Sequence, residues 1–323
     1  MDDKTNALRE HVKGIFSNLE LVLGWEPGYD PLHTRPFYVR TESDIDRLTA
    51  NCLSVHNLTR YLAKSMNAVD PAADGRKIGV CVKGCDSRSL VALIQEKFVS
   101  RDRVYVIGLP CRGTLDARRI RALVPDPARI RSVNAEGDEL VVETDQGISR
   151  FALDRAIARK CLQCRYPNPV IHDVLIGDPV TPRLKIDAEN PSVAAVEALS
   201  LEDRLLFWEN QLDRCIRCFA CRNACPLCVC QNHCIMETRM PKWLTQYRNM
   251  NEKFMFHMIH ALHLAGRCTE CGECERVCPV GIPVALIKEK INAIIYEMLD
   301  YESGTDPEAV PPLLTFSPKE TGI

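Results

Sequence analysis

The sequence lacks several features that would place it in a familiar functional class. Its formal net charge is only −2, so it has neither the basic excess typical of nucleic-acid-binding proteins nor the acidic excess of many small electron carriers. No apolar run reaches the roughly eighteen residues of a membrane helix, and the first residues, MDDKTNALRE, lack the cationic and apolar regions of a signal peptide. We therefore expect a cytoplasmic protein with no membrane span and no nucleic-acid partner.

Standard cofactor fingerprints are missing as well. Neither G-x-G-x-x-G nor G-x4-G-K-[ST] occurs, which excludes the usual dinucleotide fingerprint and the phosphate-binding loop. The C-x3-C-x2-C loop of radical chemistry would need a cysteine at the position of Arg88, after Cys81 and Cys85. Because no acid, base or nucleophile set stands out either, we assign no catalytic residue.

Cysteine, in contrast, is abundant, with 17 residues in a chain of 323. Cytoplasmic thiols are kept reduced, so close groups of them usually bind metal or carry out redox chemistry. Two segments share the spacing C-x2-C-x2-C-x3-C-P, and their first cysteines lie 53 residues apart (268 − 215). Their cysteines are Cys215, Cys218, Cys221 and Cys225 in the first repeat and Cys268, Cys271, Cys274 and Cys278 in the second.

This spacing is the signature of bacterial two-cluster ferredoxins, in which the fourth cysteine of each run binds the other cluster. Paired C-x2-C units also hold structural zinc, but zinc requires neither the third C-x2 step nor the proline. We therefore predict two [4Fe-4S] clusters with exchanged fourth ligands. Cluster 1 is assigned to Cys215, Cys218, Cys221 and Cys278, and cluster 2 to Cys268, Cys271, Cys274 and Cys225.

Residues 1–190 predict an α/β domain. Two β-rich runs, 77–82 and 103–109, flank a helical stripe and indicate a βαβ unit with parallel strands. Short alternating runs over 130–153, separated by EGD and DQG, predict an antiparallel meander. The other elements expected in this domain are helices over 5–22 and 48–64, a loop over 25–36 and a linker over 177–192.

Residues 191–301 predict a mainly α-helical, dicluster ferredoxin-like domain. The proline-rich and charged segment 302–323 is expected to be extended, either free or along a partner. Helices of the second domain are expected from the N-cap Ser200 and over 253–266 and 283–299.

The first domain contains a further set of cysteines. Cys85 and Cys111 each follow a β-rich run, and the carboxyl ends of neighbouring parallel strands are where open α/β sheets build ligand sites. The C-x2-C pair Cys161 and Cys164 could complete four sulfur ligands. The set predicts either a third [4Fe-4S] cluster or a zinc site.

Five more cysteines have less specific surroundings. Cys228, Cys230 and Cys234 follow the first repeat with a C-x-C-x3-C spacing that matches no standard cluster. They either bind an additional metal with a fourth ligand from elsewhere or are buried thiols. Cys52, on an apolar helical face, and Cys81, inside a strand, are expected in the core.

Two other patterns receive a structural interpretation. His257, His260 and His263 are spaced three apart, and we favour half-buried polar residues over metal ligands because a single helical row supplies no second ligand type. The charged run at 288–290 is expected on the solvated outer face of the last helix.

Several segments together resemble a known family: KGCDSRSLVALIQEK, VYVIGLPCRGTLD, KCLQC, CIRCFACRNACPLC and HLAGRCTECGECERVCPVGIP. They are similar to the beta-subunit family of deazaflavin-linked hydrogenases and dehydrogenases, in particular members that accompany formate dehydrogenase or heterodisulfide-reductase modules in anaerobes. The resemblance covers about residues 75–300. It implies an electron-relay subunit whose α/β domain in some members carries FAD and reduces the deazaflavin.

The order of the domains distinguishes this chain from those members. Their ferredoxin motif precedes the α/β domain, whereas here both motifs follow it. We therefore predict an iron-sulfur electron-transfer subunit of a cytoplasmic anaerobic oxidoreductase complex of the formate dehydrogenase, hydrogenase or heterodisulfide-reductase type. Its partners would be catalytic and flavin-containing subunits. The alternative is a flavin-containing subunit that itself reduces or oxidises a deazaflavin or nicotinamide coenzyme.

Overall fold

The computed structural model describes residues 3–62, 75–185, 188–230, 234–238, 245 and 247–315. The chain divides into two compact units, and each is described by itself. Unit 1 comprises Met1–Ser87 and Val99–Asp187, and unit 2 comprises Arg88–Phe98 and Ala188–Ile323. None of the helices in the described part of the chain has the length and apolar character that a membrane crossing requires.

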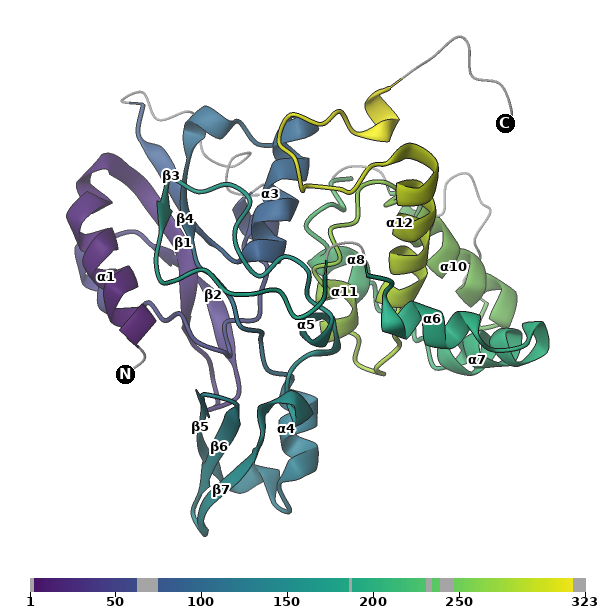
Figure 1. The fold of residues 1–323 in the computed structure, drawn as a ribbon, viewed down its shortest axis with the longest axis horizontal. Helices are drawn as coiled ribbons and strands as arrows, with labels where there is room; N and C mark the ends of the chain where they lie inside the picture. The colour runs from purple at the N-terminus through teal and green to yellow at the C-terminus, as the bar shows by residue number, and fades with distance from the viewer. Residues whose placement is uncertain are drawn as a thin grey trace. The chain divides into compact units, whose positions relative to one another are not determined.

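A five-stranded sheet in the order β2-β1-β3-β4-β8 forms the centre of unit 1 (Figure 1). β1, β3, β4 and β8 are parallel, and β2 pairs antiparallel with β1 at one edge. The strands are β1 (Leu19–Pro27), β2 (Thr34–Val39), β3 (Lys77–Val82), β4 (Val104–Gly108) and β8 (Val174–Leu175). β3 is buried over its last five residues, as expected for a central parallel strand covered on both faces. The predicted βαβ unit is confirmed as β3, α3 (Gly84–Gln95) and β4.

The first sixty residues differ from the sequence prediction. The helix predicted over 5–22 ends early, since α1 covers only Asp3–Ile15 and the chain then enters β1. The predicted loop over 25–36 is shorter than expected, because 25–27 belong to β1 and 34–36 to β2, which leaves 28–33 as the connection between the two strands. The apolar run LVLGW satisfies either helix or strand spacing, and its pairing with both β2 and β3 decides for strand.

The second predicted N-terminal helix, over 48–64, is also largely wrong. Within its described part, only the residues from Thr59 on are helical, and 63–64 lie outside the described residues. Two asparagine side chains accept hydrogen bonds from backbone N–H groups two residues on, Asn51 from Leu53 and Asn57 from Thr59. Such local bonds compete with helix formation.

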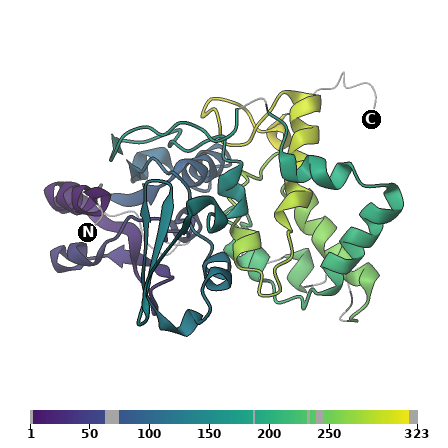
Figure 2. The same ribbon diagram turned by 60° about the horizontal axis from the view of Figure 1, so that its bottom comes forward.

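The predicted meander is confirmed as a three-stranded antiparallel sheet (Figure 1 and Figure 2). Its hairpin turns fall at the two glycine-containing triplets seen in the sequence. Ile120 of the short helix α4 belongs to the same buried apolar cluster as Leu140 and Val142 of the sheet. The elements are α4 (Ala117–Leu123), β5 (Ile130–Glu136), β6 (Glu139–Thr144) and β7 (Gly147–Ala152), followed by α5 (Arg159–Leu162).

Unit 2 is mainly helical, as predicted. Ser200 caps its longest early helix by accepting a hydrogen bond from the backbone N–H of Asp203. Its core combines apolar residues such as Leu212 and Phe256 with several cysteines of the two repeats. The helices are α6 (Pro191–Glu197), α7 (Leu201–Asp213), α8 (Ala220–Ala224), α9 (Ile235–Thr238), α10 (Met250–Leu262), α11 (Glu273–Arg276) and α12 (Ala285–Leu299).

The segment after α12 also differs from expectation. It was expected to be free or along a partner, yet its first residues pack against the part of α3 that belongs to unit 2. The Arg88 side chain donates to the Ser303 carbonyl at 3.1 and 2.9 Å, and Gln95 Nε2 donates to the Asp306 and Ala309 carbonyls. Arg88 and Ser303 are both buried. The chain therefore supplies its own partner for the first part of this segment, while 316–323 lie outside the described residues.

Candidate metal centres

The two cysteine repeats have the same backbone shape. In the first repeat, Arg217 and Phe219 adopt left-handed conformations with φ of 50° and 60°. The residues 53 positions later, Glu270 and Gly272, have φ of 55° and 67°. Three of these four are not glycine, so this backbone is held against a steric cost of about 1 kcal/mol each. Both loops lead into a short helix, α8 or α11.

The cysteines of the first repeat line a cavity together with one cysteine of the second. Cys215, Cys218 and Cys221 lie in its wall, and so does Cys278. The apolar remainder of the wall includes Phe256. The structure thus brings together the four residues assigned to cluster 1.

A second cavity has the complementary wall. Cys268, Cys271 and Cys274 line it, and the fourth cysteine is Cys225 of the first repeat. Each cavity is therefore lined by three cysteines of one repeat and one of the other, which is the grouping that the predicted exchange of fourth ligands requires. Ligation of iron by the two sets remains a prediction.

Both sets are chemically suited to an iron-sulfur cluster. Backbone N–H groups point at sulfur, with Arg217 N donating to Cys215 Sγ at 3.4 Å and Ile282 N to Cys278 Sγ at 3.3 Å. Burial raises the pKa of the Cys221 thiol to about 12 and that of the Cys268 thiol well above its usual range. Buried thiols therefore keep their protons unless a metal supplies positive charge, which is what a cluster does. The residues of both cysteine sets therefore fit a [4Fe-4S] cluster.

Two neighbouring residues at the second cavity do not lie where the sequence predicts. Lys288 and Glu289, predicted to lie on a solvated outer face, are 3% and 4% exposed, and both line the cavity with Cys225 and Cys274. By itself burial lowers the pKa of Lys288, but the charges of the surrounding cysteines outweigh it and raise the pKa. The helical pattern would bury Ile294 and Met298 on the opposite face of α12, but both are exposed.

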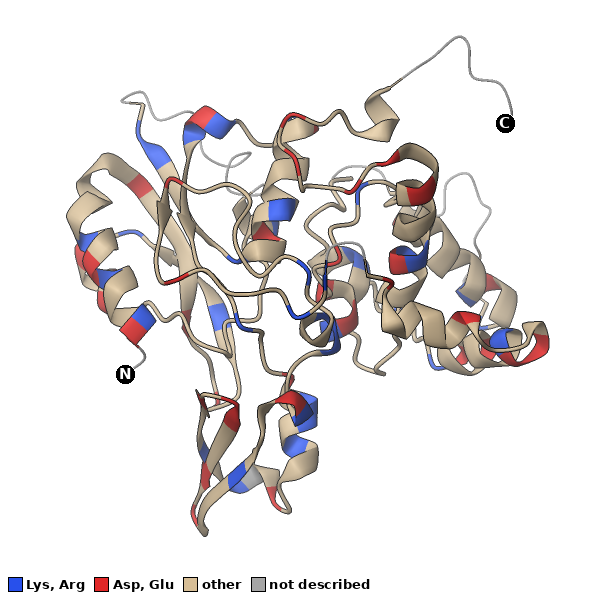
Figure 3. Cartoon of the chain, viewed as in Figure 1, with Lys and Arg blue, Asp and Glu red and all other residues tan. Residues whose placement is uncertain are grey.

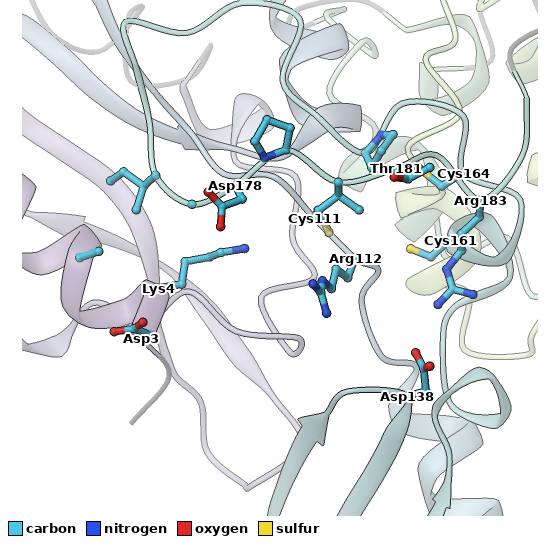
Figure 4. Close-up of a pocket in the computed structure, with 16 residues that line it drawn as sticks. Asp3, Lys4, Cys111, Arg112, Asp138, Cys161, Cys164, Asp178, Thr181 and Arg183 are labelled. Atoms are coloured by element: carbon cyan, nitrogen blue, oxygen red, sulfur yellow. The ribbon is translucent and has the colours of Figure 1, made fainter.

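In unit 1, three of the four predicted cysteines meet at one cavity of about 770 Å³ (Figure 4). Cys111, Cys161 and Cys164 lie in its wall. Burial, followed by the charge of Cys161, raises the pKa of the Cys111 thiol, and burial raises that of Cys164 to about 11. Cations also line the cavity, at Lys4, Arg112 and Arg183.

The fourth predicted residue, Cys85, is not part of that wall. Its thiol donates to Asp86 Oδ1 at 3.6 Å, and Asp86 in turn forms a buried ion pair with Lys83 at 2.7 Å. The charges of Cys85 and Cys111 both act on Lys83, so these groups are neighbours. β3 and β4 are adjacent and parallel, which puts both cysteines after the carboxyl ends of neighbouring strands, as expected.

The three cysteines after the first repeat lie in different surroundings. Cys228 Sγ is 3.3 Å from His260 Nε2, and the possible ligand atoms of these two and of Cys225, which is also assigned to cluster 2, all lie within 4.8 Å of one another. Cys230 is exposed and Cys234 is buried in the core. The sequence did not indicate the pairing of Cys228 with His260, because the two lie 32 residues apart.

Two of the three histidines are more buried than expected. His257 and His260 are 4% and 1% exposed, while His263 is exposed. Burial lowers the pKa of His257 to about 4 and that of His260 well below its usual range, and Lys288 acts in the same direction on both. Both imidazoles are therefore neutral at pH 7. Of the remaining cysteines, Cys81 is fully buried in its strand as predicted, whereas Cys52 lies in a turn rather than on a helix and packs, partly buried, against the core of unit 1.

Two family models match successive parts of the chain. Residues 75–205 match the family model for the C terminus of the beta subunit in coenzyme F420 hydrogenase/dehydrogenase. Residues 211–282 match the model of the 4Fe-4S dicluster domain, which supports iron-sulfur clusters as the cofactor. The first match contains all four cysteines of the proposed third site, and the second contains both repeats.

Two curated relatives cover most of the chain. The F420-dependent formate dehydrogenase subunit beta of Methanocaldococcus jannaschii is 23% identical over 294 residues, which is 74% of this chain and 76% of the relative. The F420-dependent formate dehydrogenase 1 subunit beta of Methanococcus maripaludis is 25% identical over 362 aligned positions, 93% of this chain and 89% of the relative.

A solved structure, the xenon-derivatised F420-reducing [NiFe] hydrogenase complex of Methanosarcina barkeri, gives a TM-score of 0.37 at 16% identity. This match covers 50% of the present chain and 58% of that chain, which is less than two thirds of its length. The family and curated matches confirm the resemblance predicted from sequence, and they agree with an iron-sulfur electron-transfer subunit. The chain thus combines a segment similar to the C-terminal domain of beta subunits in coenzyme F420 hydrogenases and dehydrogenases with a segment similar to a 4Fe-4S dicluster domain.

Proposed function

We propose that this chain is the electron-transfer subunit of a cytoplasmic oxidoreductase complex and carries single electrons through two [4Fe-4S] clusters in unit 2. The observation that supports this most directly is the pair of cavities, each lined by three cysteines of one repeat and one of the other. A [4Fe-4S] cluster supplies a one-electron acceptor that changes little in shape on reduction, so the surrounding residues need only hold it and tune it.

The residues of the chain divide this work. The eight cysteines hold the clusters, and the N–H groups of Arg217 and Ile282 stabilise charge on the sulfur atoms. Phe219 and Phe256, which pack edge to face with ring centroids 5.5 Å apart, exclude water from one side of cluster 1. Cys218 is the one exposed cysteine among the eight, so we assign it to the edge at which electrons enter or leave.

The names of the relatives support a more specific setting. Both curated relatives are beta subunits of F420-dependent formate dehydrogenases. We therefore propose that the partners are a catalytic dehydrogenase subunit and a flavin-containing subunit, with a deazaflavin coenzyme at one end of the circuit.

Unit 1 is proposed to hold a third metal centre. Three ligands to a [4Fe-4S] cluster or to zinc would come from Cys111, Cys161 and Cys164. The fourth would be Cys85, since Cys85 and Cys111 are both neighbours of Lys83. Thr114 N donates to Cys161 Sγ at 3.4 Å, the same kind of bond that the ferredoxin repeats show.

The cavity itself favours a second candidate function for unit 1. Its volume of about 770 Å³ lies within the range of small-molecule sites, and Lys4, Arg112 and Arg183 would suit an anionic ligand such as a flavin phosphate. Anaerobic purification followed by denaturation and fluorescence of the supernatant decides between the candidates: released flavin supports the second, and its absence together with iron in unit 1 supports the first.

The exchange of fourth ligands provides the main test. In Cys278→Ala we expect the cluster held by Cys215, Cys218 and Cys221 to be damaged, because Cys278 completes that cavity rather than the cavity of its own repeat. Iron should fall from about eight atoms in unit 2 to about four, and one of two paramagnetic resonance signals of the reduced protein should disappear.

Two further proteins make this test decisive. Cys230→Ala is the matched control, since this exposed cysteine lines neither cavity and its replacement should retain both signals. If Cys278→Ala instead lost the Cys268 cluster and kept the Cys215 cluster, the ligand assignment would be wrong. Wild-type protein that contained mainly zinc would end the proposal of electron transfer.

A further inference from the structure

Lys288 brings a positive charge into the centre of unit 2. It lies near the start of α12, is 3% exposed, and lines the cavity formed by Cys225, Cys268, Cys271 and Cys274. A buried ammonium group is costly unless an opposite charge lies close by. The question is therefore which group balances Lys288.

Among the described residues, no carboxylate forms an ion pair with Lys288, and its ammonium group makes no hydrogen bond. Other lysines nearby are balanced in the usual way: Lys253, which is also buried, pairs with Asp213 at 2.8 Å, and Lys290 pairs with Glu197 at 2.5 Å. The buried neighbour Glu289 accepts a hydrogen bond from Asn190 Nδ2 at 3.1 Å.

The groups that act on the charge of Lys288 are thiols. Burial by itself lowers the pKa of Lys288. The contributions that raise this pKa come from cysteines, in the order Cys274, Cys268, Cys225 and Cys221. The first three belong to the proposed cluster 2, and only Cys221 belongs to cluster 1. His257 and His260 also face Lys288 but are neutral, because burial lowers the pKa of each. The ammonium group of Lys288 therefore interacts more strongly with the cysteines of cluster 2 than with those of cluster 1.

A fixed positive charge beside a cluster favours its reduced form. Reduction adds one negative charge, and the attraction between this charge and a buried cation grows as the distance and the local dielectric constant fall. Reduction potentials of such clusters respond to net charge and burial in this way. A cation that lies nearer to one of two clusters therefore makes their reduction potentials differ, even when both clusters have the same ligands.

We propose that Lys288 is a positioning residue for electron transfer, whose ammonium group raises the reduction potential of the cluster held by Cys225, Cys268, Cys271 and Cys274 above that of the other cluster. This inference rests on the proposed function. It gives the relay a direction, since an electron entering at the Cys215 cluster is drawn toward the cluster beside Lys288.

The test is a redox titration of the full chain, followed by paramagnetic resonance. In Lys288→Met, the equilibrium constant for reduction of this cluster should fall at least tenfold, which corresponds to about 59 mV for a one-electron couple. The other cluster should change less. Lys288→Arg, which keeps the charge, should retain most of the difference between the midpoint potentials of the two clusters. The Cys278→Ala protein, in which only this cluster is expected, identifies its signal.

Lys290→Met is the matched control, because Lys290 lies two residues along the same helix but pairs with Glu197. It should leave both midpoints unchanged. Equal shifts of the two clusters in Lys288→Met, or no shift at normal iron content, would overturn the inference and leave the proposed function intact. If Lys288→Met retains too little iron, Lys288→Gln and Lys288→Arg are compared instead, and equal midpoints in these two give the same negative answer. Wild-type protein without two signals would overturn the function itself.

Discussion

Lys83 in unit 1 and Lys288 in unit 2 are both buried, but their charges are balanced differently. Lys83 Nζ lies 2.7 Å from Asp86 Oδ2, donates to the His56 carbonyl at 3.1 Å and lies 4.3 Å from the centre of the Trp25 ring. Lys288 has no carboxylate ion pair within the described residues and faces four cysteines. The sequence around Lys83 supplies its counter-charge, whereas the counter-charge that we propose for Lys288 is a cluster held by the surrounding cysteines.

The comparison shows how the two units depend on a cofactor. At Lys83 the charge is satisfied by the polypeptide alone, although Cys85 and Cys111 also lie nearby. In unit 2, cysteines of both repeats belong to the core, so binding of the proposed clusters there would also contribute to the free energy of folding. Along the rest of the chain, acidic and basic residues are interspersed, as Figure 3 shows for the described residues.

The largest change is expected when a cysteine near Lys83 is removed. If Cys111 binds a third [4Fe-4S] cluster, Cys111→Ala should lose about four iron atoms per chain, measured by metal analysis of anaerobically purified protein. Cys52→Ala is the control, because Cys52 packs against the apolar core. A loss of zinc instead of iron would identify the zinc site. Unchanged metal content would mean that Cys111 has a structural role. The charge of Lys83 would then be balanced by protein groups alone.

The next largest effect is expected for Asp86→Ala. This change leaves the Lys83 ammonium group buried without its carboxylate, which typically costs about 3–5 kcal/mol in the free energy of unfolding. Trp25, which contacts Lys83, reports the unfolding of unit 1 by its fluorescence. Asp145→Ala, at an exposed ion pair, is the control. A loss below about 1 kcal/mol in Asp86→Ala would mean that the nearby thiols, rather than Asp86, balance Lys83.

The smallest effect is expected at Asp173, a partly exposed counterpart of Asp86. Burial raises the pKa of Asp173, but the hydrogen bonds from Arg101 and from Val106 N outweigh it and lower the pKa below 3.8. The stabilisation of the folded state by ionised Asp173 is thus fully present above the pKa that this group has in the unfolded chain. It disappears as the pH falls through the lower pKa of the folded state. Asp173→Asn should cost about 1 kcal/mol at pH 7 and less near pH 3, measured by Trp25 fluorescence. A cost that does not change with pH would contradict this assignment.

Much of the metal chemistry could be predicted because it depends on short spacings. Three cysteines two residues apart, followed by a fourth and a proline, define a loop and a departing helix without reference to the rest of the chain. The hairpin turns of the meander are equally local. The second predicted N-terminal helix failed because side-chain bonds from Asn51 and Asn57 override an apolar spacing that fits a helix.

By itself, the sequence determined the two cysteine repeats, the parallel β3–β4 pair and the antiparallel meander, because each follows from contacts between residues close in the chain or from a turn. Only the tertiary structure decided that Lys288 is buried, that Cys228 meets His260, and that Cys85 lies outside the wall shared by Cys111, Cys161 and Cys164. A helix presents whichever face its neighbours cover, and those neighbours come from distant parts of the chain.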